Sequence, residues 1–265
     1  MGIAGLLLVL GYAGLCMLLY VQQRSLIYFP HGTRPPAAAT DIAITRPDAV
    51  LRGWVVNPGH PRALVYFGGN GERIEWNRDA FRDALPTTTV YLLAYRGYGA
   101  SDGNPEESLI LADALAVFDE AVARHGSGQV DVAGRSLGTG VASYVASQRD
   151  VRRLVLVTPF DSLASVAQAH YPAFPVRWLL RDRYDSLHYL PRHRGDLLVL
   201  RAGRDEVIPT RHTQALLDAF GRPAQVVDFP GADHNSVSDD PRYWTSLGRF
   251  LQADGKPGVS PRGAR

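Results

Sequence analysis

The chain begins with a long apolar stretch and continues, from about residue 42, with short apolar runs separated by helical stretches. The central runs, such as ALVYFGG and TVYLLAY, are continuously apolar, which is typical of strands buried on both faces of a parallel sheet. The two earliest runs are more mixed and favour an antiparallel edge. The predicted strands are 41–46, 52–57, 62–68, 88–95, 130–133, 154–158, 197–202 and 225–229.

The helical stretches alternate with these strands, which predicts a doubly wound α/β domain with a mostly parallel sheet flanked by helices. In the second stretch the apolar residues recur every three or four positions, so that one face is apolar. Residues 162–191 interrupt the alternation with YPAFPV and DRYDSLHYLP and predict a short cap insertion. The predicted helices are 73–84, 106–124, 138–147, 210–220 and 242–252.

Residues 3–21 contain no charged side chain, and nineteen residues at about 1.5 Å each span roughly 28 Å, close to the thickness of the bilayer hydrocarbon. We expect a single-pass anchor over residues 1–28. A cleaved signal peptide and a buried core helix are the alternatives, but nothing basic precedes Ile3. Arg24 and Arg34 follow the span and favour a cytoplasmic catalytic part, although two arginines leave the side of the membrane open.

Composition narrows the choice of class. The chain of 265 residues fits one domain, predicted over 29–253, with a disordered tail over 254–265. A net charge of +2 lacks the basic excess of a nucleic-acid binder. Cys16 is the single cysteine, which excludes an internal disulfide framework and a multi-cysteine zinc site. Lys256 is the single lysine, so the folded region lacks the lysine of a phosphate-binding P-loop.

Gly134-Arg135-Ser136-Leu137-Gly138 fits G-x-S-x-G, directly after the apolar run VDVAG and directly before a helical stretch. A serine on such a sharp strand-to-helix turn is a nucleophile elbow, and the crowding of that turn requires glycines on both sides. The alternative is an ordinary turn with an N-capping serine.

A serine nucleophile requires a base and an orienting acid, which follow it in the order Asp or Glu, then His, at the carboxyl ends of strands. Asp205 follows the run LLVLRAG, and His234 follows VVDFPG. We therefore predict Ser136 as nucleophile, Asp205 as acid and His234 as base. Glu206 and, less well, Asp233 are alternative acids.

An oxyanion hole requires two backbone N–H groups aimed at the developing negative charge. We assign these to Leu137 and Asn70, with Gly69 as the alternative to Asn70. No H-E-x-x-H motif occurs, and His188 and His193 are expected to be surface residues, so neither a metal nor an organic cofactor is predicted.

The motifs FGGNGE, AYRGYGASDGNPEE, AGRSLGTGVA, TPFDSL, YPAFPVRWLLRDRYDS, GRDEVIP and GADHNSV occur in the order seen in the membrane-anchored α/β-hydrolase-domain serine hydrolases. That group, which includes protein depalmitoylases and lysophospholipases, resembles this chain over roughly residues 20–252. The resemblance implies an α/β-hydrolase fold and the same triad and oxyanion residues. Within these motifs, Gly69, Tyr98 and Phe160 are expected to contact substrate. Gly68 and Ala94 stand where relatives often carry His and Asp, which affects loop shape and substrate fit.

The expected function is hydrolysis of an ester or thioester of an acyl, lipid-like substrate through an acyl-enzyme. Tyr171, Phe174 and Trp178 of the insertion are candidates either to line an acyl pocket or to touch the membrane, and the apolar pattern equally fits a simple cover for the sheet. The alternatives are a serine peptidase of the same fold and a catalytically inactive, membrane-tethered binding module.

Overall fold

The structure is a computed structural model that describes residues 2–36 and 39–253, so the predicted tail over 254–265 lies outside the described residues. The described chain forms one eight-stranded sheet in the order β1-β2-β4-β3-β5-β6-β7-β8. The strands are β1 Ile42–Thr45, β2 Val50–Val56, β3 Arg62–Phe67, β4 Thr88–Leu93, β5 Val130–Arg135, β6 Arg153–Val157, β7 Asp196–Ala202 and β8 Gln225–Phe229.

The pairing of the strands confirms the predicted arrangement of the sheet. Strands β3 to β8 are mutually parallel, whereas β1 pairs antiparallel with β2 and β2 antiparallel with β4. Parallel strands place their carboxyl ends at one edge, so the loops after β3, β5, β7 and β8 gather there. The residues predicted to do chemistry lie in those four loops.

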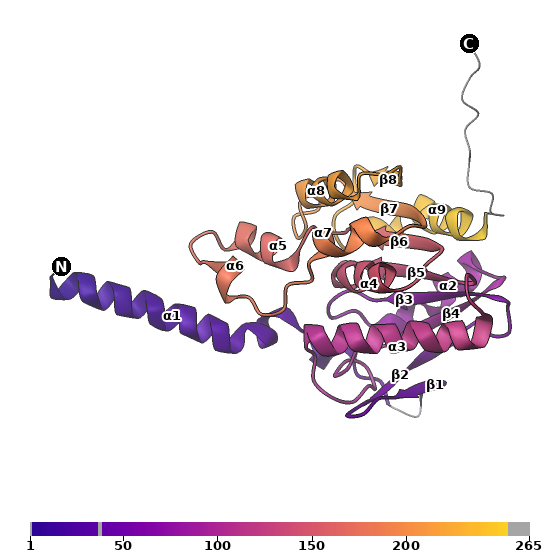
Figure 1. Ribbon diagram of the computed structural model, residues 1–265, viewed down its shortest axis with the longest axis horizontal. Coiled ribbons are helices and arrows are strands. Elements are labelled where there is room, and N and C mark those ends of the chain that lie inside the picture. Colours follow the sequence, from indigo (N-terminus) through magenta and orange to yellow (C-terminus); the bar gives the residue numbers. More distant parts are fainter. Residues whose placement is uncertain (1, 37–38, 254–265) are drawn as a thin grey trace, which may run out of the picture.

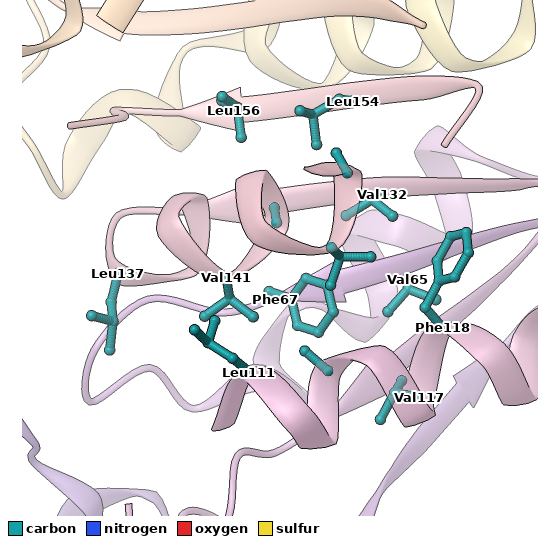
Figure 2. Close-up of a cluster of buried hydrophobic side chains, with 14 of the residues drawn as sticks. Val65, Phe67, Leu111, Val117, Phe118, Val132, Leu137, Val141, Leu154 and Leu156 are labelled. Carbon is teal, nitrogen blue, oxygen red and sulfur yellow. The ribbon is translucent and has the colours of Figure 1, made fainter. Parts of the chain in front are cut away.

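Helices cover both faces of the sheet (Figure 1). On one face α3, α4 and α8 pack over alternate strand residues, including Val65 and Phe67. The residues between them, such as Leu64 and Tyr66, face the second core, to which α2 and α9 contribute. Figure 2 shows the first core between α3, α4 and the strands. The helices are α2 Arg78–Ala84, α3 Glu107–His125, α4 Leu137–Gln148, α8 Thr210–Phe220 and α9 Pro241–Gln252.

One predicted helix is divided in the structure. Residues 73–84 form a 3-10 turn, η3 Ile74–Asn77, followed by α2. Ile74 turns into the core, and the side-chain amide of Asn77 donates a hydrogen bond to Glu72 at 2.5 Å. The core contact of Ile74 and the local hydrogen bond of Asn77 together favour the tighter turn over a continuous α-helix.

Helix α1, Ile3–Ile27, extends away from the domain as a single rod (Figure 1). It is six residues longer than the charge-free run 3–21 that predicted it. The helix is long and apolar enough to cross a membrane, and none of its most apolar window is buried within the protein. An all-round apolar helix without protein around it is typical of a membrane span.

The last turn of α1 is fixed to the domain rather than free. Gln23 is buried, and its side chain donates to the carbonyl of Leu179 at 3.2 Å and accepts from the N–H of Arg181 at 2.7 Å. Arg24 forms ion pairs with Asp182 at 3.1 Å and with Glu106 at 2.7 Å. The last turn of α1 therefore packs directly against the domain, with no linker between the apolar helix and the first contacts of the domain.

Residues 162–191 form three short helices, α5 Leu163–His170, α6 Val176–Leu179 and α7 Ser186–Tyr189, and lead into a 3-10 turn, η4 Leu190–Arg192. Figure 1 shows α5 and α6 at the end of the molecule from which α1 projects. His188 is exposed as expected. The expectation for His193 is wrong, because its ring is 1% exposed and stacks on Phe220.

Candidate active site

Ser136 lies on the tight turn between β5 and α4 with φ 50° and ψ −119°. A positive φ is strained for a residue with a Cβ atom, so surrounding packing must hold it. A Cβ atom at Gly138 would lie 2.1 Å from the carbonyl oxygen of Phe67, and one at Gly134 would lie 2.2 Å from the carbonyl oxygen of Gly138. The two glycines therefore permit the close approach of backbone that holds the turn.

The structure brings Ser136, His234 and Asp205 into one hydrogen-bonded series. Ser136 Oγ lies 2.9 Å from His234 Nε2, and His234 Nδ1 lies 2.8 Å from Asp205 Oδ2. Asp205 and His234 are 8% and 9% exposed. In this geometry the acid orients the imidazole, and the opposite ring nitrogen faces the serine hydroxyl.

The local structure separates Asp205 from its sequence alternatives. The second carboxylate oxygen of Asp205 accepts the backbone N–H groups of Val207 and Ile208 at 3.0 and 2.7 Å, which fixes the side chain toward His234. The side chain of Glu206 is on the exposed side of the same turn. Asp233 accepts the N–H groups of the two residues after His234, and therefore serves the turn that carries the imidazole.

The loop after β3 lies directly against the serine. A Cβ atom placed on Gly69 would be 3.6 Å from the Cβ atom of Ser136. The N–H of Gly69 donates to the carboxylate of Glu72 and is therefore occupied. Within the part of the chain that the structure describes, the N–H groups of Asn70 and Leu137 have no acceptor, which leaves them available to a ligand oxygen.

Two charged residues that hold this loop were not singled out from the sequence. Glu72 accepts hydrogen bonds from Gly69 and from the phenol of Tyr66, the latter at 2.9 Å, and Arg135 lies 3.9 Å from the same carboxylate. Arg135 also donates to the carbonyls of His234 and Asn235 at 3.4 and 3.2 Å. Arg135 thus joins the oxyanion loop to the histidine loop.

The electrostatics of this pair follow from burial and charge. Burial lowers the pKa of the Arg135 guanidinium, but the negative charge of Glu72 and neighbouring groups outweighs it and raises the pKa above the ordinary value. Arg135 therefore remains a cation throughout the working pH range. The signal for both residues was present in the sequence, since Glu72 ends FGGNGE and Arg135 is the first of the two variable residues of the serine motif.

The side chain of Asn70 is directed toward the end of α1. Its amide donates to the carbonyl of Ile27, and its oxygen accepts from the N–H of Phe29 at 3.2 Å and from the phenol of Tyr98 at 2.6 Å. Tyr98 is buried beside this loop. Phe160 is also buried, in the core near Gly140. Substrate contact by Gly69, Tyr98 and Phe160 stays a prediction.

Within residues 2–36 and 39–253, no group of three or more His, Cys, Asp or Glu side chains is arranged to hold a metal ion. The site as described consists of side chains and backbone donors.

Comparison with known proteins agrees with the fold. A sequence model of the alpha/beta hydrolase fold matches residues 63–182. An uncharacterized protein of Mycobacterium tuberculosis is 34% identical over 90% of each chain. The lysophosphatidylserine lipase ABHD12 of Xenopus tropicalis is 32% identical over 58% of this chain and 45% of its own, so this chain spans less than half of that relative.

Among solved structures, a Pyrococcus furiosus esterase superposes with a TM-score of 0.64 at 17% identity, over 80% of this chain and 89% of its own. At that identity the likeness concerns the fold alone. Together with the matched sequence model and the parallel sheet, the relatives show that the chain belongs to the α/β-hydrolase family.

Proposed function

We propose that the protein is a serine hydrolase that cleaves carboxylic ester or thioester bonds of acyl, lipid-like substrates. The observation that carries this proposal is the hydrogen-bonded series from Ser136 through His234 to Asp205, with the serine on a strained turn. A neutral hydroxyl is a weak nucleophile, and this series supplies both the base and the group that orients it.

In the proposed reaction His234 Nε2 accepts the proton of Ser136 Oγ as that oxygen bonds to the substrate carbonyl carbon. The carbonyl oxygen becomes an oxyanion beside the N–H groups of Asn70 and Leu137. The imidazolium then protonates the departing alcohol or thiol, which leaves an acyl ester on Ser136. Water, deprotonated by His234, attacks that ester, and the carboxylic acid and free serine are regenerated.

The substrate class is proposed from two further features. Helix α1 supports a single-pass membrane anchor, because its apolar window is unburied and its last turn is built into the domain. An active site at the edge of the sheet nearest that helix is suited to acyl compounds that partition into a bilayer. A relative named a lysophosphatidylserine lipase is consistent with this class.

The test is labelling of the full chain in detergent with a fluorophosphonate probe, followed by hydrolysis assays. Ser136→Ala is expected to abolish labelling and to lower kcat by about 10⁴-fold to 10⁶-fold. Ser147→Ala is the matched control, because Ser147 lies at the far end of α4, where its hydroxyl donates to the carbonyl of Tyr144 and accepts from the side-chain amide of Gln148.

Hydrolysis of matched ester, thioester and amide substrates identifies the bond. We expect turnover of the ester and the thioester and none of the amide. Labelling that persists in Ser136→Ala, or an intact protein that labels but hydrolyses only the amide, would contradict the proposal.

A further inference from the structure

The tip of the segment between β6 and β7 presents aromatic side chains to solvent beside α1. Residues 171–180 are named the cap tip here. Trp178 is 87% exposed and Tyr171 is 61% exposed. Exposed aromatic side chains gathered at one place are costly in water and mark a surface that meets another apolar phase. The sequence left open whether these residues line a pocket or touch the membrane, and their exposure disfavours a closed pocket.

Besides the hydrogen bond from Gln23 to Leu179 at the polar end of α1, the cap tip contacts the apolar part of the helix. The Tyr12 phenol donates to the carbonyl of Ala173 at 2.7 Å, and the Tyr12 ring stacks on Phe174 with centroids 6.0 Å apart and planes 1° from parallel. Tyr12 lies about 14 Å along the helix axis from Val21, the end of the charge-free run. Whatever surrounds that part of α1 therefore also surrounds the cap tip (Figure 1).

The backbone of the cap tip is prepared for an environment without water. Pro172 and Pro175 have no N–H group to satisfy. The amide of Gln168 donates to the carbonyls of Tyr171 and Phe174 at 3.3 and 2.9 Å. In hydrocarbon each unsatisfied backbone group costs several kcal/mol, so a loop can enter only where such partners are supplied internally.

The formal charges within the cap tip and at its two adjoining residues are of one sign. From His170 to Arg181 the chain contains no acidic residue, while Arg177 and Arg181 flank the aromatic positions. The Arg181 guanidinium lies 5.8 Å from the ring of Tyr20 on α1. Long arginine side chains extend to phosphates while their stems stay in apolar surroundings. Aromatic residues with flanking cations are the composition of segments that lie in a membrane interface.

We propose that the cap tip inserts into the same leaflet through which α1 leaves the domain, so that the protein meets the bilayer at two places. Tyr171, Phe174 and Trp178 contact acyl chains and glycerol groups, and Arg177 contacts lipid phosphates. The proposal rests on the proposed membrane location of α1. It places the opening of the active site against the bilayer and makes the lipid phase itself the source of substrate.

Depth-dependent quenching tests the insertion. The full chain carries a single cysteine, Cys16, in α1. Trp178→Cys and Ser127→Cys are each made in a Cys16→Ala background. The wild-type chain, labelled at Cys16, reports on a position within the span. Ser127 is exposed in the turn before β5, at the opposite edge of the sheet. Each protein carries an environment-sensitive fluorophore and is reconstituted in phosphatidylcholine vesicles containing doxyl-labelled phosphatidylcholine.

We expect acyl-chain doxyl groups to quench the labels at 16 and 178 and to leave the label at 127 unaffected. A label at 178 that is as little quenched as the label at 127 would overturn the proposal. Blue-shifted emission from the label at 178 without quenching by lipid would also overturn it, because it would show that protein rather than lipid covers this position. If the label at 16 were also unquenched, α1 would not lie in the membrane, and the proposal would be overturned because it rests on that location.

Activity provides an independent measurement. Tyr171→Ser/Trp178→Ser is expected to lower turnover of an ester presented in vesicles by at least about tenfold, because burial of even one large apolar side chain is worth a decade or more in partition. Turnover of a short, water-soluble ester and fluorophosphonate labelling should be unchanged. Equal activity of this variant and the wild type on vesicles would overturn insertion, whereas loss of labelling in both proteins would instead contradict the serine mechanism.

Discussion

The side-chain amide of Asn70 donates a hydrogen bond to the backbone carbonyl of Ile27, the last residue of α1. The same residue supplies one of the two proposed oxyanion N–H groups. The end of the apolar helix therefore holds the loop that is proposed to stabilise the transition state. This link gives Asn70 a role for its side chain that is separate from the role of its backbone.

Asn70→Ala retains the backbone N–H and removes the link to α1. We expect kcat on a soluble ester to fall about tenfold to a hundredfold, because misplacement of a donor by about 1 Å has effects of that size, with KM little changed. Asn70→Asp keeps the acceptor for Phe29 and Tyr98 but also loses the donor to Ile27 and adds negative charge beside the developing oxyanion, so it should lose at least as much. Wild-type kcat in Asn70→Ala would show that the link does not position the loop.

Glu72→Gln tests the other support of that loop. The substitution removes the charge that faces Arg135 and weakens the hydrogen bond from Gly69. We expect kcat to fall about tenfold, since a looser oxyanion loop loses its pre-organisation. Glu120→Gln, which removes an exposed ion pair with Arg124, is the matched control. Steady-state kinetics on one soluble ester compares the two, and equal kcat values would refute the assignment.

Asp205→Asn distinguishes the acid of the triad from its neighbours. The amide of Asn keeps the position of the side chain but favours the imidazole tautomer that carries its proton on Nε2, which cannot accept the serine proton. We therefore expect kcat to fall by about 10⁴-fold. Glu206→Gln should remain within a few-fold of wild type, because Glu206 is exposed and the carboxylate that contacts His234 is that of Asp205. Burst kinetics with an activated ester measures acylation directly in both variants. A larger loss of kcat in Glu206→Gln than in Asp205→Asn would show that Glu206, not Asp205, is the acid of the triad.

We expect the buried His193 to make the folded domain less stable in acid. Burial lowers the pKa of its ring below the ordinary 6.5. The unfolded chain therefore binds a proton that the folded chain does not, and stability decreases as the pH falls from about 6.5 toward the lower folded pKa. His193→Gln should flatten the pH dependence of the unfolding free energy between pH 6.5 and 5, measured in urea on the detergent-solubilised chain. His188→Gln, an exposed change on the same segment, should retain it.

Patterns with a local cause were predictable from the sequence. The strand ends fall within two residues of the predicted ones at every strand, because each buried run is bounded by turn residues. The antiparallel edge was visible because the first two runs are more mixed, whereas the central runs are continuously apolar. The elbow was predictable because Gly134 and Gly138 are required by a turn that spans only five residues.

Contacts between distant segments were not predictable in this way. Nothing near Asn70 in the sequence indicates that its side chain bonds Ile27, since the two are 43 residues apart. The burial of His193 depends on Phe220 and on the carbonyl of Asp196, which its ring faces at 3.2 Å. The division of 73–84 depends on the packing of Ile74 into the second core. Each of these outcomes is decided by tertiary packing that a single-sequence pattern does not contain.

The direct passage from α1 into the domain determines the reach of the enzyme. A flexible linker would let a catalytic domain sample a hemisphere whose radius grows with the square root of the linker length. Gln23 and Arg24 eliminate that freedom, because the helix is clasped by the domain before it ends. With α1 in a bilayer, the reactive serine has one fixed height and one orientation. The proposed enzyme would therefore select substrates by the distance between their scissile bond and the membrane plane.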